Sequence, residues 1–231
     1  MTRGTLYGLG VGPGDPELLT LKAVRILKEA DVIAVPDKGS GEKTALHIVE
    51  AYIQGKPLLP CATPMVRDQQ VLDAAHHRIA DSICTLLEEG KTVAFITLGD
   101  PTVYSTYMYV HRRVLERGYE AVLVPGVPSF CAVAARLGQS LCEQSERLMI
   151  VPASHKDIGD CLDADANLVF MKAGREIGAL REALHSRGLP EKASLVANCG
   201  MEGEQVFPRF ADMPEDTGYF SVVLVKKGDK A

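Results

Sequence analysis

The sequence lacks an excess of positive charge. Its 231 residues include 25 lysines and arginines against 30 aspartates and glutamates, which gives a formal net charge of −5. Proteins that bind nucleic acid or anionic lipid non-specifically present a basic field. The composition therefore argues against both partners, and an anionic substrate would need individual lysines or arginines to bind it.

Long apolar runs, paired cysteines and metal-ligand clusters are also missing. No window approaches the roughly 18 apolar residues of a membrane helix, and the N-terminus has no apolar segment of the signal-peptide type. The six cysteines form no C-x-x-C pair, so we expect reduced thiols. His76-His77 has no further ligand at helical spacing, and no metal site is predicted. We expect a soluble, cytoplasmic protein that binds neither membrane nor nucleic acid.

Nucleophile motifs are absent too. The chain has no G-x-S-x-G elbow and no recognisable Ser/His/Asp arrangement. A covalent intermediate is therefore not expected.

Apolar segments of strand length alternate with longer helical patterns along almost the whole chain, which predicts βαβ units around largely parallel sheets. The expected fold class is α/β, with two compact domains, 1–124 and 125–231, divided at the turn Pro125-Gly126. The last two apolar segments, 205–210 and 219–225, are predicted to be antiparallel strands that close the second sheet. Strands are expected at 5–9, 32–35, 92–97, 119–124, 147–151, 167–171 and 193–198, and helices at 18–27, 44–54, 71–87, 129–137, 175–187 and in a segment ending at 117.

A glycine-rich loop, GLGVGPGD at 8–15, follows the first predicted strand. It contains neither G-x-G-x-x-G nor G-x-x-x-x-G-K-[ST], so it matches no phosphate loop. Pro13 offers no N–H, and Asp15, predicted to cap the next helix with Pro16 at its first position, would repel a phosphate. The loop indicates instead close approach of a bulky ligand to the backbone, at the carboxyl ends of the strands.

Three ordered motifs resemble the tetrapyrrole (class III) methyltransferases. They are GVGPGDPELLTLKA at 10–23, LGDPTVYST at 98–106 and VPGVPSF at 124–130. Within that family the second and third motifs look like the enzymes that methylate C-20 in corrin synthesis. Leu98, Thr102, Tyr104 and Pro128 depart from the pattern of the uroporphyrinogen III methyltransferases.

The resemblance implies two α/β domains, a homodimer, and S-adenosyl-L-methionine bound in a trough between the domains. It implies a tetrapyrrole substrate, precorrin-2 or cobalt-factor II. The cofactor-binding positions carried over from the family are Pro13, Leu98, Gly99, Asp100, Val103, Ser105, Thr106, Ser129, Phe130, Met171, Asn198, Phe220 and Ser221. Residues at positions such as those of Phe220 and Ser221 are more often core and ladder residues than ligand contacts.

Methyl transfer from a sulfonium needs no nucleophilic side chain, so the predicted mechanism is positioning. Asp100, Tyr104 or Tyr107 could assist loss of a proton from the acceptor, although each has an ordinary structural role as an alternative. A cobalt atom of the substrate could receive an axial contact from His111 or His155. Some of Lys38, Lys43, Arg67, Arg112, Arg113, Arg136, Lys172 and Arg175 are expected to bind the substrate carboxylates.

Other readings stay open at this point. The same family could act at another tetrapyrrole position or on another acceptor. A nucleotide-binding oxidoreductase or phosphotransferase is disfavoured because no phosphate loop exists, and a non-catalytic module is hard to reconcile with three intact motifs.

Overall fold

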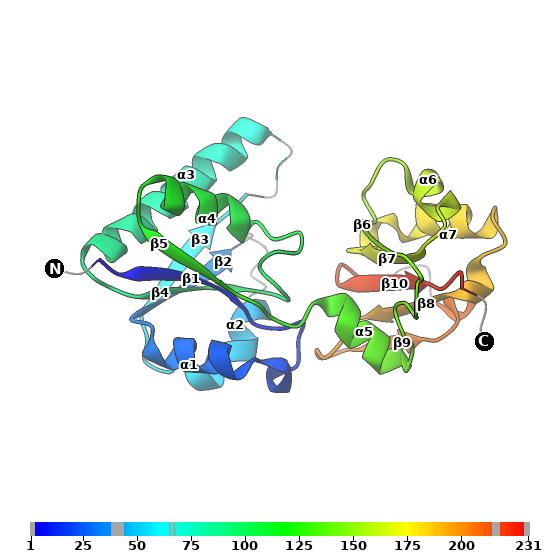
Figure 1. Ribbon diagram of the computed structural model, residues 1–231, viewed down its shortest axis with the longest axis horizontal. Helices are drawn as coiled ribbons and strands as arrows, with labels where there is room; N and C mark the ends of the chain where they lie inside the picture. Colours follow the sequence, from blue (N-terminus) through cyan, green and yellow to red (C-terminus); the bar gives the residue numbers. More distant parts are fainter. Residues whose placement is uncertain (1–2, 38–43, 65, 67, 214–217, 229–231) are drawn as a thin grey trace. The chain divides into compact units, whose positions relative to one another are not determined.

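The computed structural model describes residues 3–37, 44–64, 66, 68–213 and 218–228. The chain divides into two compact units, Met1–Pro128 and Ser129–Ala231, and each has its own five-stranded sheet with helices on both faces (Figure 1). The α/β class expected from the alternating pattern is confirmed. The division follows Pro128, slightly beyond the Pro125-Gly126 turn, since Gly126 is hydrogen-bonded to the first unit.

The first sheet is entirely parallel, with strand order β3-β2-β4-β1-β5. Its strands are β1 (Thr5–Gly10), β2 (Val32–Asp37), β3 (Leu58–Ala62), β4 (Val93–Thr97) and β5 (Glu120–Val124). Strand β3, which contains Pro60, was not predicted from the sequence. A proline is tolerated there because β3 is an edge strand, paired only with β2.

Helices cover both faces of this sheet. In Figure 1, α1 (Leu21–Glu29) and α2 (Thr44–Val49) lie below it, while α3 (Gln69–Glu88) and α4 (Tyr107–Glu116) lie above. All five residues of β4 are buried: Val93 and Phe95 pack with α3 and α4, and Ala94 and Ile96 pack with α1. The alternation places Thr97, the last residue of β4, on the α3–α4 face.

The start of α1 differs from the expectation. Asp15 is a cap and Pro16 follows it, as predicted, but they begin a short 3₁₀ turn (η1, Pro16–Leu18). Helix α1 has its own cap, Thr20, whose hydroxyl accepts a hydrogen bond from the Ala23 N–H at 3.1 Å. A second 3₁₀ turn, η2 (Glu50–Tyr52), follows α2.

The second sheet is mixed, with strand order β6-β7-β10-β8-β9. Its strands are β6 (Leu148–Pro152), β7 (Asn167–Met171), β8 (Ala193–Ala197), β9 (Gln205–Phe207) and β10 (Ser221–Val225). Both final strands are antiparallel to β8, as expected, yet they do not lie together. β9 forms an edge, whereas β10 lies in the centre between β7 and β8.

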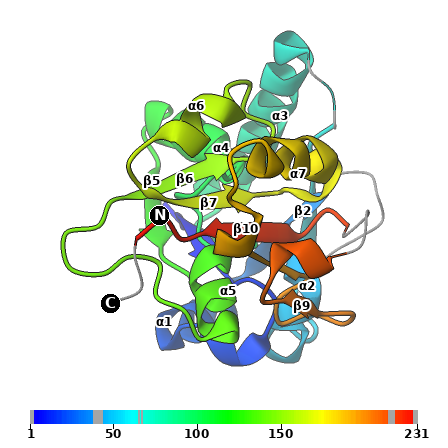
Figure 2. The ribbon, with the colours of Figure 1, turned by 90° about the vertical axis from the view of Figure 1, so that its right-hand side faces the viewer.

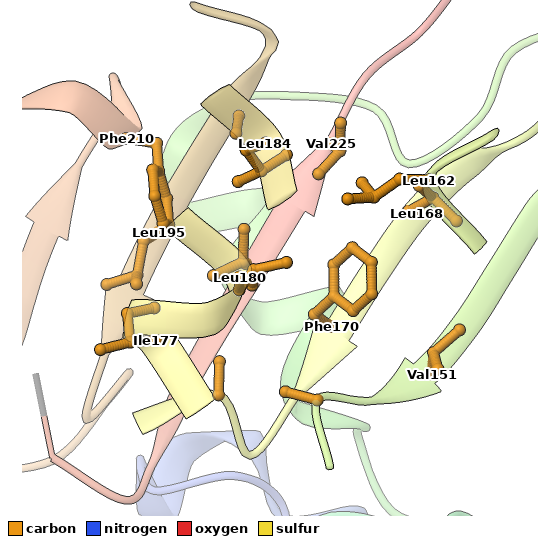
Figure 3. Close-up of a cluster of buried hydrophobic side chains, with 14 of the residues drawn as sticks. Val151, Leu162, Leu168, Phe170, Ile177, Leu180, Leu184, Leu195, Phe210 and Val225 are labelled. Carbon is orange, nitrogen blue, oxygen red and sulfur yellow. The ribbon is translucent and has the colours of Figure 1, made fainter. Parts of the chain in front are cut away.

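Helix α5 (Ser129–Leu137) covers one face of this sheet, and α6 (Ile158–Asp163) and α7 (Ile177–His185) cover the other (Figure 2). Phe170, Leu180 and Leu195 lie at the centre of the α6–α7 core (Figure 3). The short α6 was not predicted. The 3₁₀ turns are η3 (Gly174–Glu176), η4 (Pro190–Lys192) and η5 (Phe210–Asp212).

Over the described ranges, none of the helices is both long and apolar enough to span a membrane. The same residues contain no cluster of three histidine, cysteine or acidic side chains placed to hold a metal ion.

Candidate active site

The first two sequence motifs meet at the carboxyl ends of β1 and β4. Gly12 and Gly99 form a two-way backbone bridge, in which the Gly99 N–H donates to the Gly12 carbonyl at 2.7 Å and the Gly12 N–H donates in return at 3.3 Å. One residue earlier, the Val11 N–H donates to the Thr97 carbonyl at 2.9 Å. The two loops are therefore held as one surface.

The third motif packs directly on that surface. A Cβ atom at Gly126 would lie 2.3 Å from the Gly99 carbonyl oxygen and 2.7 Å from the Gly10 carbonyl carbon. A Cβ at Gly10 would lie 2.5 Å from the Gly126 nitrogen. Only glycine fits where three backbone segments approach so closely, which explains the glycines at 10 and 126.

Asp100 lies at this junction and is only 8% exposed. One carboxylate oxygen, Oδ2, accepts a hydrogen bond from the Gly126 N–H at 3.0 Å. The other, Oδ1, accepts from the Thr102 N–H at 2.8 Å and from the Thr102 hydroxyl at 2.5 Å. Both oxygens are thus engaged by the protein.

Tyr107 lies beneath the first loop and is fully buried. Its hydroxyl is 3.0 Å from Nδ1 of His111, and its ring fills the space beside Gly8, where a Cβ would lie 1.9 Å from Cε1. Burial raises the pKa of Tyr107 well above its usual range, so the phenol stays protonated. This geometry is typical of a packing residue. His111 is buried as well, and burial lowers its pKa. Its contact with Tyr107 gives it a packing role, and an axial contact with a substrate cobalt stays a prediction.

Tyr104 contrasts with Tyr107. It is 46% exposed, and its φ of 47° places a bulky residue in the left-handed region. The neighbouring Ser105 is half-buried and Thr106 is exposed. The Ser105 hydroxyl oxygen accepts from the Tyr107 N–H at 3.2 Å and keeps its proton to donate. This segment therefore presents a phenol and two hydroxyls.

Thr97 is a further residue of this region that the motifs did not indicate. It is 7% exposed, and its hydroxyl oxygen is buried without a hydrogen-bond partner. Beside it in β1 is Gly10, which has no side chain to offer. The signal was present in the sequence, as a lone polar residue that ends an apolar strand immediately before the second motif.

The first loop is not arranged for phosphate. The Asp15 carboxylate accepts a hydrogen bond from the Glu17 N–H at 2.8 Å and so occupies the N-terminus of η1 with its own negative charge. Pro13 is buried within the loop. In the second motif, Leu98 and Val103 are both half-buried.

The remaining proposed cofactor residues belong to the second unit. Met171 is the last residue of β7, Asn198 follows β8, and Phe220 precedes β10, which runs antiparallel to both strands. All three therefore lie at the same edge of that sheet. The Asn198 N–H donates to the Phe220 carbonyl at 3.0 Å. Ser221 is fully buried, it pairs with Ala197 in the sheet, and its hydroxyl donates to the Gly218 carbonyl at 2.9 Å. These contacts are those of a structural residue of the strand. Ser129 and Phe130 begin α5, and Phe130 is buried.

The basic residues fall into three groups. Lys38, Lys43 and Arg67 lie outside the described residues. Arg113 pairs with Asp73, Arg136 pairs with Glu204 at 2.5 Å, and Arg112 lies over the Tyr109 ring at 5.3 Å. Lys172 and Arg175 are exposed and directly follow β7, at the same edge as Met171. His155 is exposed.

Comparison with known proteins gives matches over nearly the whole chain. The family model of tetrapyrrole (corrin/porphyrin) methylases matches residues 5–213. The chain is 36% identical to the cobalamin biosynthesis protein CobIJ of Mycobacterium bovis, over 98% of this chain and 46% of that protein, so it spans about half the length of that curated relative. It is 33% identical to the cobalt-precorrin-2 C(20)-methyltransferase of Salmonella typhimurium, over 97% of each chain.

The fold also matches a solved structure. The uroporphyrin-III-C-methyltransferase of Thermus thermophilus superposes with a TM-score of 0.73 at 27% identity, over 97% of this chain and 95% of that one. The family match covers most of the chain and includes the three motifs that meet at the first sheet. The chain belongs to the tetrapyrrole (corrin/porphyrin) methylase family.

Proposed function

We propose that this chain transfers a methyl group from S-adenosylmethionine to C-20 of precorrin-2 or of cobalt-factor II in cobalamin biosynthesis. The observation that carries the proposal is the meeting of three glycine loops around Asp100, in a site that has no place for a phosphate. The similarity to the Salmonella C(20)-methyltransferase over the whole length of both chains supports the position of methylation.

The residues present fit S-adenosylmethionine. Gly10, Gly99 and Gly126 let the backbones of the three loops pack directly on one another, and we propose that the cofactor binds on the surface these loops form. Ser105 and Thr106 of the second motif supply hydroxyls for the polar groups of the amino acid or the sugar. Pro13, Leu98, Val103, Ser129, Phe130, Met171, Asn198 and Phe220 are the further residues that we propose to hold the cofactor, and Ser221 would act only by holding the backbone of β10.

When bound, S-adenosylmethionine supplies a methyl group that is already activated by the positive sulfur. The work left to the protein is to hold the acceptor carbon in line and to exclude water, which can contribute about 7–11 kcal/mol. No covalent intermediate on a side chain is part of the proposal.

Among the tyrosines, the geometry favours Tyr104 as the group that assists proton loss. It is half-exposed in the second motif, whereas the Tyr107 hydroxyl is buried against His111. A general acid or base must come within hydrogen-bond reach of the reacting proton. Tyr104 meets the exposure requirement for that contact and Tyr107 does not.

Lys172 and Arg175 are the proposed anchors for the substrate carboxylates in the second unit. Both are exposed and follow β7. Arg136 pairs with Glu204, whose pKa is lowered by the Gly200 N–H and by Arg136 itself. If Arg175 binds a substrate carboxylate, Arg175→Glu raises KM for the acceptor and leaves the affinity for S-adenosylhomocysteine unchanged.

The protein is further proposed to act as a homodimer in the cytoplasm, as the family resemblance implies. Light scattering after size-exclusion chromatography tests the dimer. A monomer at micromolar concentration would contradict it.

The decisive experiment is incubation of the purified protein with S-adenosylmethionine and either precorrin-2 or cobalt-factor II under anaerobic conditions, followed by mass spectrometry and NMR. We expect one added methyl group, at C-20, and the faster substrate identifies the branch. Binding of S-adenosylhomocysteine without methylation of either compound would leave the cofactor proposal standing and reject the acceptor.

A further inference from the structure

Asp100 was expected to be a catalytic or cofactor-binding residue, but its contacts within the protein suggest another role. Its carboxylate is buried, and its two oxygens accept three hydrogen bonds, from the Gly126 N–H and from the N–H and hydroxyl of Thr102. Because both oxygens are already engaged by the protein, the carboxylate is held in one orientation between the two loops.

We infer that Asp100 is a positioning residue, which ties the loop after β5 to the loop after β4 and so sets the spacing of the three motifs. The inference rests on the proposed function, because the spacing matters only for a ligand that those loops bind. Among the described residues, Asp100 provides the side chain that accepts the hydrogen bond of the Gly126 N–H.

The surroundings of Gly126 show why a tie is needed there. The loop after β5 leaves the sheet and packs backbone to backbone on Gly10 and Gly99. Such contacts lack side chains, so they bury little apolar area and contribute little hydrophobic stabilisation. A charge-assisted hydrogen bond at 3.0 Å gives this packing a fixed distance and direction.

The carboxylate also has a chemical reason to be an aspartate. Gly126 and Thr102 present three donors, and only an ionised carboxyl group accepts at both oxygens. In Asp100→Asn the side-chain amide accepts at one end and donates at the other. Its NH₂ group must then face either the Gly126 N–H or the Thr102 donors, and at least one tie is lost.

The test compares Asp100→Asn and Thr102→Val with Thr85→Val, a matched control that removes a hydroxyl bonded to the Asp81 carbonyl in α3. Amide hydrogen exchange at Gly126 in the ligand-free protein, the Kd for S-adenosylhomocysteine by calorimetry, and kcat as a function of pH are measured. For Asp100→Asn we expect faster exchange at Gly126 and a Kd raised about 10-fold or more, as for a lost charged hydrogen bond. The pH profile of kcat keeps its shape.

The opposite pattern overturns the inference. If Asp100→Asn leaves exchange and Kd unchanged while kcat falls by about 10²–10⁴-fold and loses its dependence on a deprotonated group, Asp100 is the proton acceptor. If Asp100→Asn does not fold, Thr102→Val is the variant that tests the inference, because it keeps the carboxylate and removes one of its donors. If its Kd for S-adenosylhomocysteine equals that of Thr85→Val, the positioning role is refuted. If the wild-type protein does not bind S-adenosylhomocysteine, the proposed function is refuted. Amide exchange at Gly126 would still test the hydrogen bond between Asp100 and Gly126.

Discussion

Replacing Gly8 with alanine tests the packing of β1 against α4. The added methyl group would lie 1.9 Å from Cε1 and 2.5 Å from the hydroxyl oxygen of Tyr107, whose ring is fully buried. The ring must therefore move, and its hydrogen bond to His111 breaks. Overpacking costs about 1–3 kcal/mol, and leaving buried polar groups unpaired costs about 1–3 kcal/mol more. We expect Gly8→Ala to lower the free energy of unfolding by about 2–6 kcal/mol.

Urea unfolding followed by far-UV circular dichroism measures this change, and a double-mutant cycle identifies its cause. In a Tyr107→Leu background the ring is gone, so Gly8→Ala should cost much less than in the wild type. Gly178→Ala is the control: Gly178 is an exposed residue of α7 with nothing within 4 Å of the added Cβ. It should stabilise the second unit by about 0.5–1 kcal/mol. An equal cost of Gly8→Ala in both backgrounds would refute the steric reasoning.

Three further results are expected. Tyr104→Phe slows single-turnover methyl transfer, whereas Tyr107→Phe mainly lowers stability, by about 1–3 kcal/mol, because it leaves His111 without its partner; equal rates in wild type and Tyr104→Phe would remove tyrosine from the proton transfer. Thr97→Val keeps or raises the thermal unfolding midpoint, because the hydroxyl it removes has no partner; a clear fall would show that a partner exists. Burial lowers the pKa of His76 below 6.5, and Arg113 lowers it further against the opposing effect of Asp73. The folded form thus binds fewer protons than the unfolded form, and stability is lost as the pH falls from 6.5 toward the lower pKa of the folded state. His76→Leu should flatten this part of the stability curve, and parallel curves for the two proteins would contradict it.

The sequence predicted the α/β class and most of the strands because buried parallel strands such as β4 are continuous apolar runs. It did not reveal β3, since Pro60 breaks the strand pattern and only an edge position makes that proline acceptable. Nor did it place β10, because the pairing of a strand is decided by partners far away in the chain, here β7 and β8.

The same limit applies to the site. The three motifs identify which loops matter, but the contact between Asp100 and Gly126 joins residues 26 positions apart. The difference between Tyr104 and Tyr107 is likewise invisible in the sequence, where both are tyrosines of one motif. It arises because Gly8 leaves a space in β1 that the ring of Tyr107 fills.

The central position of β10 has a consequence for synthesis on the ribosome. The five strands of the first sheet all lie before residue 125, so that sheet can be completed while the rest of the chain is still being made. In the second sheet the pairs β6-β7 and β8-β9 are joined by hydrogen bonds only through β10, so they form one sheet only when residues 221–225 enter between them. Until then, β7 and β8 each expose an unpaired edge. The nascent second unit must therefore wait for its last strand, and this interval is when it is most open to aggregation or to chaperones.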